Sequence, residues 1–262
     1  MPDSINILAV HDLVKTHTTG FRAVNGLTFA VPRGSVFGFL GLNGAGKTST
    51  IRIIAGLSAA DAGSVFFDGR AITPDGTWYK SRIGCVLDEP LYFEWMSARE
   101  YLMFSGTMHG IPASVVAERT EELLSFFDLG PKADDPIGEY STGMKKKTSI
   151  AAAVLHRPEL ILLDEPLEGI DAVASVAIRE SLAQMASRGV TVFITSHVLE
   201  TVERLCTDIA IIHQGSLLLR CATKEIRTMA SSAMSDRTYA SLEELFVDLV
   251  SGKARKKHLS WI

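Results

Sequence analysis

The residues with the clearest chemical meaning form a glycine-rich segment. Gly41-Leu42-Asn43-Gly44-Ala45-Gly46-Lys47-Thr48 matches GxxxxGK[ST], the pattern of a phosphate-binding loop. Its glycines let successive backbone N–H groups point at one anion, and the helix expected next adds the positive end of its dipole. Lys47 supplies a charge for the phosphates, and Thr48 a hydroxyl for Mg²⁺. The complete pattern disfavours the alternative of a plain turn with a solvated Lys47, so the segment predicts a nucleotide phosphate site.

A second centre of chemistry is a pair of carboxylates. Leu160-Ile161-Leu162-Leu163 reads as a buried strand and ends in Asp164-Glu165. Ligands of open α/β sheets gather beyond the carboxyl ends of the strands. Asp164 is therefore expected to face the metal ion, commonly through a water, and Glu165 to polarise the water that attacks the γ-phosphate. The alternative, a capping Asp beside a solvated Glu, is disfavoured by the phosphate loop.

A third segment, Tyr140-Ser141-Thr142-Gly143-Met144-Lys145, precedes an alanine-rich helix expected over Thr148–Leu155. Ser141 and the backbone N–H groups around Gly143 would lie at a helix N-terminus, which favours an anion. The segment also reads as a simple N-cap, and the two interpretations are compatible because a cap creates the anion site. Further on, Thr195-Ser196-His197 ends another expected strand.

In this order, the segments resemble the ATP-binding subunit of ABC transporters, over about residues 5 to 225. The 140–144 segment resembles the LSGGQ-like signature, Gly169-Ile170-Asp171 the D-loop, and His197 the switch histidine. The resemblance implies that ATP and Mg²⁺ bind, that Asn43, Ala45 and Ser49 belong to the nucleotide site, and that His197 hydrogen-bonds the γ-phosphate and the attacking water. It also implies that Ser141, Thr142 and Gly143 close over ATP held by an opposing subunit. Glu165, His197 and Lys47 are the expected catalytic residues.

The resemblance also implies partners. Tyr-Ser-x-Gly-Met looks most like subunits of bacterial and archaeal ABC exporters that pair with a separate membrane-spanning chain. We therefore expect a permease subunit, a second ATPase subunit (the same chain or a paralogue), and a cytoplasmic location, peripheral on the cytoplasmic face of the cell membrane.

Three positions depart from the family pattern. Asp88 follows Ile83-Gly84-Cys85-Val86-Leu87 where the family has a glutamine, and its shorter carboxylate is expected to keep a metal contact alongside Thr48 and Asp164. His17 takes the place of the adenine-stacking aromatic, with Phe21 as the alternative. Thr142 replaces a signature glycine, so it adds a side chain where close approach is needed.

Short apolar runs that alternate with longer helical patterns predict the elements that position these residues. We expect an α/β fold with a RecA-like P-loop NTPase core, a mainly parallel sheet, an N-terminal antiparallel β region and an inserted helical subdomain. The expected divisions are a core over 1–87 and 157–221, a helical insertion over 88–156 and a C-terminal helical extension over 222–262. Expected strands are 5–14, 23–31, 35–40, 64–67, 160–163, 190–195 and 209–213, and a helix is expected from about 46 to 57.

Two apolar patterns are helical. Val116, Leu123, Leu124 and Phe127 line one face of a helix in the insertion, and the stripe Leu242, Leu245, Phe246, Leu249 and Val250 is expected to pack on its own domain. The basic run 255–258 is expected to be a solvated tail. Tyr92, Phe93 and Trp95 are expected to pack the base of the insertion, although they also fit a groove for the membrane partner.

Composition narrows the function classes. The 262 residues carry 26 basic and 30 acidic side chains, a net charge of −4, which argues against nucleic acid as the main partner. Three separated cysteines argue against a disulfide framework or a zinc site and for a reducing compartment. The start of the chain lacks the features of a signal peptide, and its longest apolar runs, about six residues, are far short of the roughly 18–20 that span a bilayer.

Two other interpretations stay open at this point. A soluble ABC ATPase acting on ribosomes or DNA usually has tandem cassettes or a long coiled coil, which this chain lacks. A P-loop kinase or GTPase is disfavoured by the signature-like segment, by His197 and by the absence of an Asn-Lys-x-Asp type segment.

Overall fold

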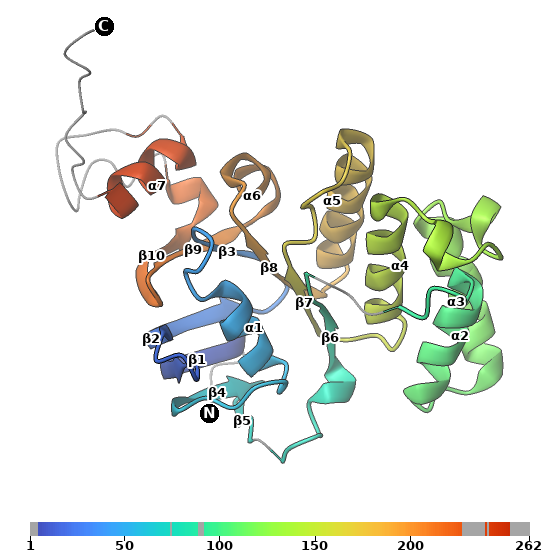
Figure 1. Ribbon diagram of the computed structural model, residues 1–262, viewed down its shortest axis with the longest axis horizontal. Helices are drawn as coiled ribbons and strands as arrows, with labels where there is room; N and C mark the ends of the chain where they lie inside the picture. Colours follow the sequence, from blue (N-terminus) through green and yellow to red (C-terminus); the bar gives the residue numbers. More distant parts are fainter. Residues whose placement is uncertain (1–4, 74, 89–91, 227–238, 240, 252–262) are drawn as a thin grey trace, which may run out of the picture.

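A computed structural model describes residues 5–73, 75–88, 92–226, 239 and 241–251. They form two β-sheets with helices packed around them (Figure 1). The antiparallel sheet has the order β2-β1-β4-β5: Arg22–Pro32, Asn6–Thr16, Ala62–Phe67 and Arg70–Ala71. The six-stranded sheet has the order β10-β9-β3-β8-β7-β6: Ser216–Ala222, Asp208–His213, Val36–Leu40, Thr191–Ser196, Leu160–Asp164 and Ile83–Val86. All its strands are parallel except β10.

The central strands β3, β7 and β8 are buried on both faces, which explains why their sequences are nearly continuous apolar runs. Along β3, Phe37 and Phe39 enter the apolar core shared with the antiparallel sheet, whereas Val36 and Leu40 enter the core on the other face. This alternation follows from the two-residue repeat of a strand. The expected α/β fold with a parallel sheet and an N-terminal antiparallel region is confirmed.

Seven α-helices are described. They are α1 (Lys47–Ile54), α2 (Ala98–Met108), α3 (Ala113–Phe126), α4 (Thr142–Val154), α5 (Ala172–Ser187), α6 (Leu199–Leu205) and α7 (Leu242–Ser251). Between β6 and β7 the described residues form helices, 3-10 turns and one isolated bridge, as expected for a helical insertion. Figure 1 shows α2 and α3 at the end of the molecule opposite α7. On the α3 face, Val116, Leu124 and Phe127 are buried, and Leu123 is partly buried.

Several boundaries differ from expectation. The first helix ends at Ile54 rather than at about residue 57, because Gly56 takes a positive φ of 71° just past the helix and ends it. The two N-terminal strands run one or two residues longer than expected. Strand β10 was not expected: Gln214 and Gly215, with φ of 47° and 78°, form a tight turn that folds it back on β9.

The C-terminal stripe packs on its own chain, as expected. Leu242, Leu245 and Phe246 are buried in the main core, and α7 lies against α6. The basic run 255–258 lies outside the described residues. Among the helices described, none combines the length and the apolar character needed to span a bilayer.

Candidate active site

The glycine-rich loop joins the buried strand β3 to helix α1 and forms an anion cradle. Gly46 is the N-cap of α1 with φ 104°, no side chain caps the helix, and its first turn contains no acidic residue. A Cβ on Gly46 would lie 2.1 Å from the Ala23 carbonyl oxygen, so only glycine fits there. The backbone N–H groups at the start of α1 therefore remain available to an anion. Of the remaining loop residues, Gly41 and Ala45 are buried, and Asn43 and Gly44 are exposed.

Lys47 lies within this cradle and is 6% exposed. Its Nζ donates to the carbonyl oxygens of Gly41 at 2.8 Å and Leu42 at 3.4 Å. The same Nζ lies 3.2 Å from Oε1 of Glu165. The structure thus brings two of the three expected catalytic residues into a buried ion pair.

Asp164 ends β7 almost fully buried. Its Oδ1 accepts a hydrogen bond from Thr195 Oγ1 at 2.6 Å, whereas its Oδ2 has no hydrogen-bond partner among the described atoms. A buried carboxylate oxygen without a partner is costly. Asp164 lines the same pocket of about 740 Å³ as Thr48 and Asp88. These three oxygen-bearing side chains were the expected metal ligands, and their chemistry fits a hydrated Mg²⁺ ion.

Glu165 is held in a backbone conformation that is rare for its residue type. Its φ is 46°, its N–H donates to Thr195 Oγ1 at 3.0 Å, and its carbonyl accepts from Lys146 Nζ at 2.7 Å. The carboxylate lies between Lys47 and His197: its Oε1 faces Lys47 Nζ, and its Oε2 lies 3.1 Å from His197 Nδ1. The carboxylate is therefore oriented from both sides.

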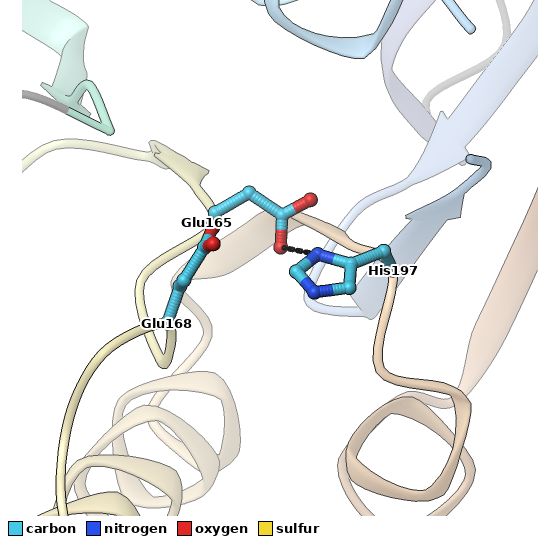
Figure 2. Close-up of side chains that lie close together, drawn as sticks. All are labelled: Glu165, Glu168 and His197. Carbon is cyan, nitrogen blue, oxygen red and sulfur yellow. Dashed lines mark hydrogen bonds and ion pairs between the residues drawn. The ribbon is translucent and has the colours of Figure 1, made fainter. Parts of the chain in front are cut away.

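Figure 2 shows how Glu165, Glu168 and His197 gather. One ligand atom from each lies within 4.8 Å of the other two. His197 follows the last residue of β8, and Glu168 follows β7 in the segment that leads to α5. Glu168 was not among the expected site residues, because one exposed Glu in a loop carries no sequence signal of its own.

Lys146 is a second site residue that the sequence did not predict. It is 7% exposed, on the second turn of α4. Burial lowers the pKa of its ammonium, whereas the carboxylates of Asp88, Glu168, Glu165 and Asp164 act in the opposite direction. In the sequence it is the middle of three consecutive lysines, so composition alone does not reveal which of them points inward.

The mouth of the phosphate pocket, about 350 Å³, contains the two alternatives for adenine stacking. His17 and Phe21 are both exposed, and their rings lie parallel at 6.5 Å. The ring of His17 also lies 3.2 Å from Ser49 Oγ, at Nε2. The two residues line this pocket together with Lys47 and Asp88.

The signature-like segment forms the start of α4, away from the phosphate loop of its own chain. Ser141 is the N-cap and accepts a hydrogen bond from Met144 N at 3.3 Å. Ser141 and Thr142 are exposed, and neither lines the phosphate pocket. Gly143 is buried, and a Cβ there would lie 2.8 Å from the Ala174 Cβ of α5. Asp171, in the segment that resembles the D-loop, caps α5 through Ala174 N.

The aromatic residues after Asp88 behave differently from one another. Tyr92 is partly buried and accepts a hydrogen bond from Ser149 Oγ at 2.9 Å, as expected for packing inside the insertion. Phe93 and Trp95 are instead 46% and 75% exposed, so the expectation that they pack the base of the insertion is wrong. Together with Phe104, which contacts Phe93, they form an aromatic surface beside α2.

Comparison with known proteins is consistent with this geometry. A family model described as ABC transporter matches residues 24–168. The chain is 36% identical over 225 residues to a linearmycin resistance ATP-binding protein of Bacillus subtilis (strain 168), covering 86% of this chain and 72% of that protein. It is 35% identical to a bacitracin transport ATP-binding protein of Bacillus licheniformis, covering 81% and 68%. A solved structure of the ATP binding subunit of an ABC transporter is similar, with a TM-score of 0.82, 30% identity and coverage of 93% and 99%.

Proposed function

The chain belongs to the ATP-binding subunits of ABC transporters, and from this membership we propose that it powers an exporter as one half of an ATP-closed dimer. ATP binding, ATP hydrolysis and service to a membrane transporter come with the family. The proposal adds the direction of transport, the roles of individual residues and the dimer. Relatives named for linearmycin resistance and for Nod factor export support the direction.

Binding begins with the phosphates at the start of α1. The uncapped N–H groups and the Lys47 ammonium supply positive potential there, and His17 with Phe21 offers two flat rings for the adenine. A Mg²⁺ ion held near Thr48, Asp164 and Asp88 would neutralise phosphate charge. Asp164 Oδ2, which is buried and has no hydrogen-bond partner within the described part of the chain, is the atom that supports this placement.

Hydrolysis requires a base near the attacking water. Glu165 takes the proton of that water on its carboxylate while the water oxygen bonds to the γ-phosphorus and the bond to ADP breaks. The observation that carries this assignment is the chain of contacts from Lys47 through Glu165 to His197, with distances of 3.2 and 3.1 Å. His197 keeps the carboxylate oriented and contacts the γ-phosphate.

The dimer is inferred from the position of the Ser141 turn. Ser141 and Thr142 lie exposed at a helix N-terminus and do not reach the phosphate pocket of their own chain. A second subunit, identical or a paralogue, would present this turn to the ATP held here. In this arrangement 1–87 with 157–221 is the nucleotide-binding core, 88–156 carries the turn, and 222–262 is an extension.

The membrane partner is a permease chain. The exposed aromatic surface of Phe93, Trp95 and Phe104 beside α2 would receive its cytoplasmic segment. With that partner, the subunit would lie on the cytoplasmic face of the membrane. No observation favours the alternative of a soluble ATPase acting on ribosomes or DNA.

Size-exclusion chromatography tests the dimer. Glu165→Gln is expected to elute as a dimer with ATP and Mg²⁺ and as a monomer without nucleotide, because ATP binds but is hydrolysed slowly. Lys47→Ala is the control and should stay monomeric. A Glu165→Gln chain that binds ATP yet stays monomeric at all protein concentrations, and that fails to co-purify with a permease from membranes, would refute the proposal.

A further inference from the structure

Two residues near the start of helix α4 lie a short distance apart and point to different surroundings. Its N-cap, Ser141, is exposed and available to a facing subunit. Lys146 lies five residues further, about 7.5 Å along the helix axis at roughly 1.5 Å per residue. Its side chain turns inward and donates to the carbonyl oxygen of Glu165 at 2.7 Å. One rigid helix therefore touches both the expected partner surface and the main chain of the catalytic carboxylate.

Lys146 contacts Glu165 at a point where the backbone is in a rare conformation. The backbone of Glu165 lies in the left-handed region, with φ 46°, which a residue other than glycine keeps only when its surroundings hold it. The Glu165 N–H donates to Thr195 Oγ1, and its carbonyl accepts from Lys146 Nζ at 2.7 Å and from the Glu168 N–H at 3.2 Å. If Lys146 moves, the carbonyl keeps only the longer of its two hydrogen bonds, and the carboxylate loses its alignment between Lys47 and His197.

A second contact ties α4 to the same region. Gly143 is buried against Ala174 in the first turn of α5, so closely that a Cβ would lie 2.8 Å away. The segment from Glu165 to Asp171 connects β7 to α5. Movement at the start of α4 is therefore transmitted to both ends of the segment that bears Glu165.

We propose that Lys146 is a positioning residue that couples the two ATP sites of the dimer, by linking the Ser141 turn to Glu165 of its own chain. In the dimer, Ser141 meets the ATP of the facing subunit, whereas Glu165 serves the ATP of its own subunit. Engagement of one ATP thus aligns the base for the other. This inference depends on the proposed dimer.

A double-mutant cycle on ATP turnover tests the coupling in the full-length protein. Lys146→Met keeps the length of the side chain and removes the donor, and Ser141→Ala removes the contact with the facing ATP. Each single variant is expected to lower kcat about 10-fold. Lys146→Met should also keep ATP affinity at equilibrium within about 2-fold of wild type, because Lys146 does not line the phosphate pocket. If Lys146 transmits the effect of Ser141, the double variant should also lose about 10-fold rather than the roughly 100-fold of independent effects.

Lys147→Met is the matched control. It removes the neighbouring lysine of the same helix, whose Nζ lies 3.8 Å from Asp128 Oδ2. Its kcat should match that of wild type, and its effect should add to that of Ser141→Ala without coupling. Thermal unfolding of each variant checks folding. If Lys146→Met unfolds, Lys146→Gln replaces it, because its shorter amide stops short of the Glu165 carbonyl.

The outcomes separate this inference from the proposed function. Additive losses in the Lys146–Ser141 cycle, or wild-type kcat in Lys146→Met, would overturn the coupling role even if Glu165→Gln dimerises with ATP. Failure of Glu165→Gln to dimerise despite binding ATP would instead remove the dimer on which both proposals rest.

Discussion

Replacing Glu165 with Gln should change ATP affinity as well as catalysis. In the structure, Glu165 Oε1 lies 3.2 Å from Lys47 Nζ, and the two side chains are 10% and 6% exposed. The ammonium that is expected to bind the phosphates is therefore already paired with the base. ATP must compete with that pair, and its phosphates must also approach the Glu165 charge. Glu165→Gln removes both penalties.

The size of the effect follows from the distance. Two unit charges about 3.2 Å apart attract by about 5 kcal/mol at an effective dielectric constant of about 20. Desolvation of the two groups offsets most of this energy, which leaves about 1 to 2 kcal/mol for ATP to overcome. Glu165→Gln should then bind ATP about 5- to 30-fold more tightly, while loss of the general base lowers kcat by about 10² to 10⁴.

Equilibrium titration with a fluorescent ATP analogue measures the affinity, and phosphate release measures kcat. Glu168→Gln is the matched control, because it removes a carboxylate from the same pocket and leaves the Lys47–Glu165 pair intact. Its affinity should change by less than about 3-fold. Equal tightening in both variants would show that overall charge, not the ion pair, limits binding. Undiminished turnover in Glu165→Gln would remove Glu165 from the role of base.

Three further predictions concern binding, pH and packing. Lys47→Ala should lose ATP binding in the same titration, because Lys47 is the only Lys or Arg among the described residues that line the phosphate pocket. Burial lowers the pKa of His156 from 6.5 to about 4. As pH falls, His156 takes up a proton in the unfolded chain before it does so in the folded chain. The free energy of unfolding should therefore fall by up to about 3 kcal/mol as pH drops from about 6.5 to 4. Urea titrations of His156→Gln should show a smaller fall. Gly84→Ala should destabilise by about 1–3 kcal/mol in thermal melts, since its Cβ would lie 2.2 Å from the Ala153 carbonyl oxygen, whereas Gly130→Ala, with nothing within 4 Å, should not.

Much of the fold was predictable because burial leaves a local pattern. Strands β3, β7 and β8 are apolar throughout because both of their faces are covered. The phosphate loop was equally predictable, since its glycine positions are a requirement of main-chain geometry: Gly46 has φ 104° and no room for a Cβ. Strand β10 escaped prediction because its burial is mixed, so it lacks a clear alternation.

The errors have physical causes too. Phe93 and Trp95 are aromatic, and aromatic side chains are usually buried, yet here they lie on the surface beside α2. Whether such residues are covered depends on the neighbouring helix and on any partner, neither of which their own sequence specifies. The same limit applies to Lys146, whose inward direction is set by how α4 packs against β6 and α5.

The sequence by itself determined which groups this protein uses on phosphate: a glycine-rich turn, Lys47, Asp164 and Glu165 in order along the chain. These choices are local, because each depends on backbone freedom or charge at a fixed position. Only the tertiary structure decided that Glu165 Oε1 pairs with Lys47, that Oε2 faces His197, and that Lys146 holds the Glu165 carbonyl. Those contacts join residues far apart in the chain, and their distances depend on the packing of β7, β8 and α4 together.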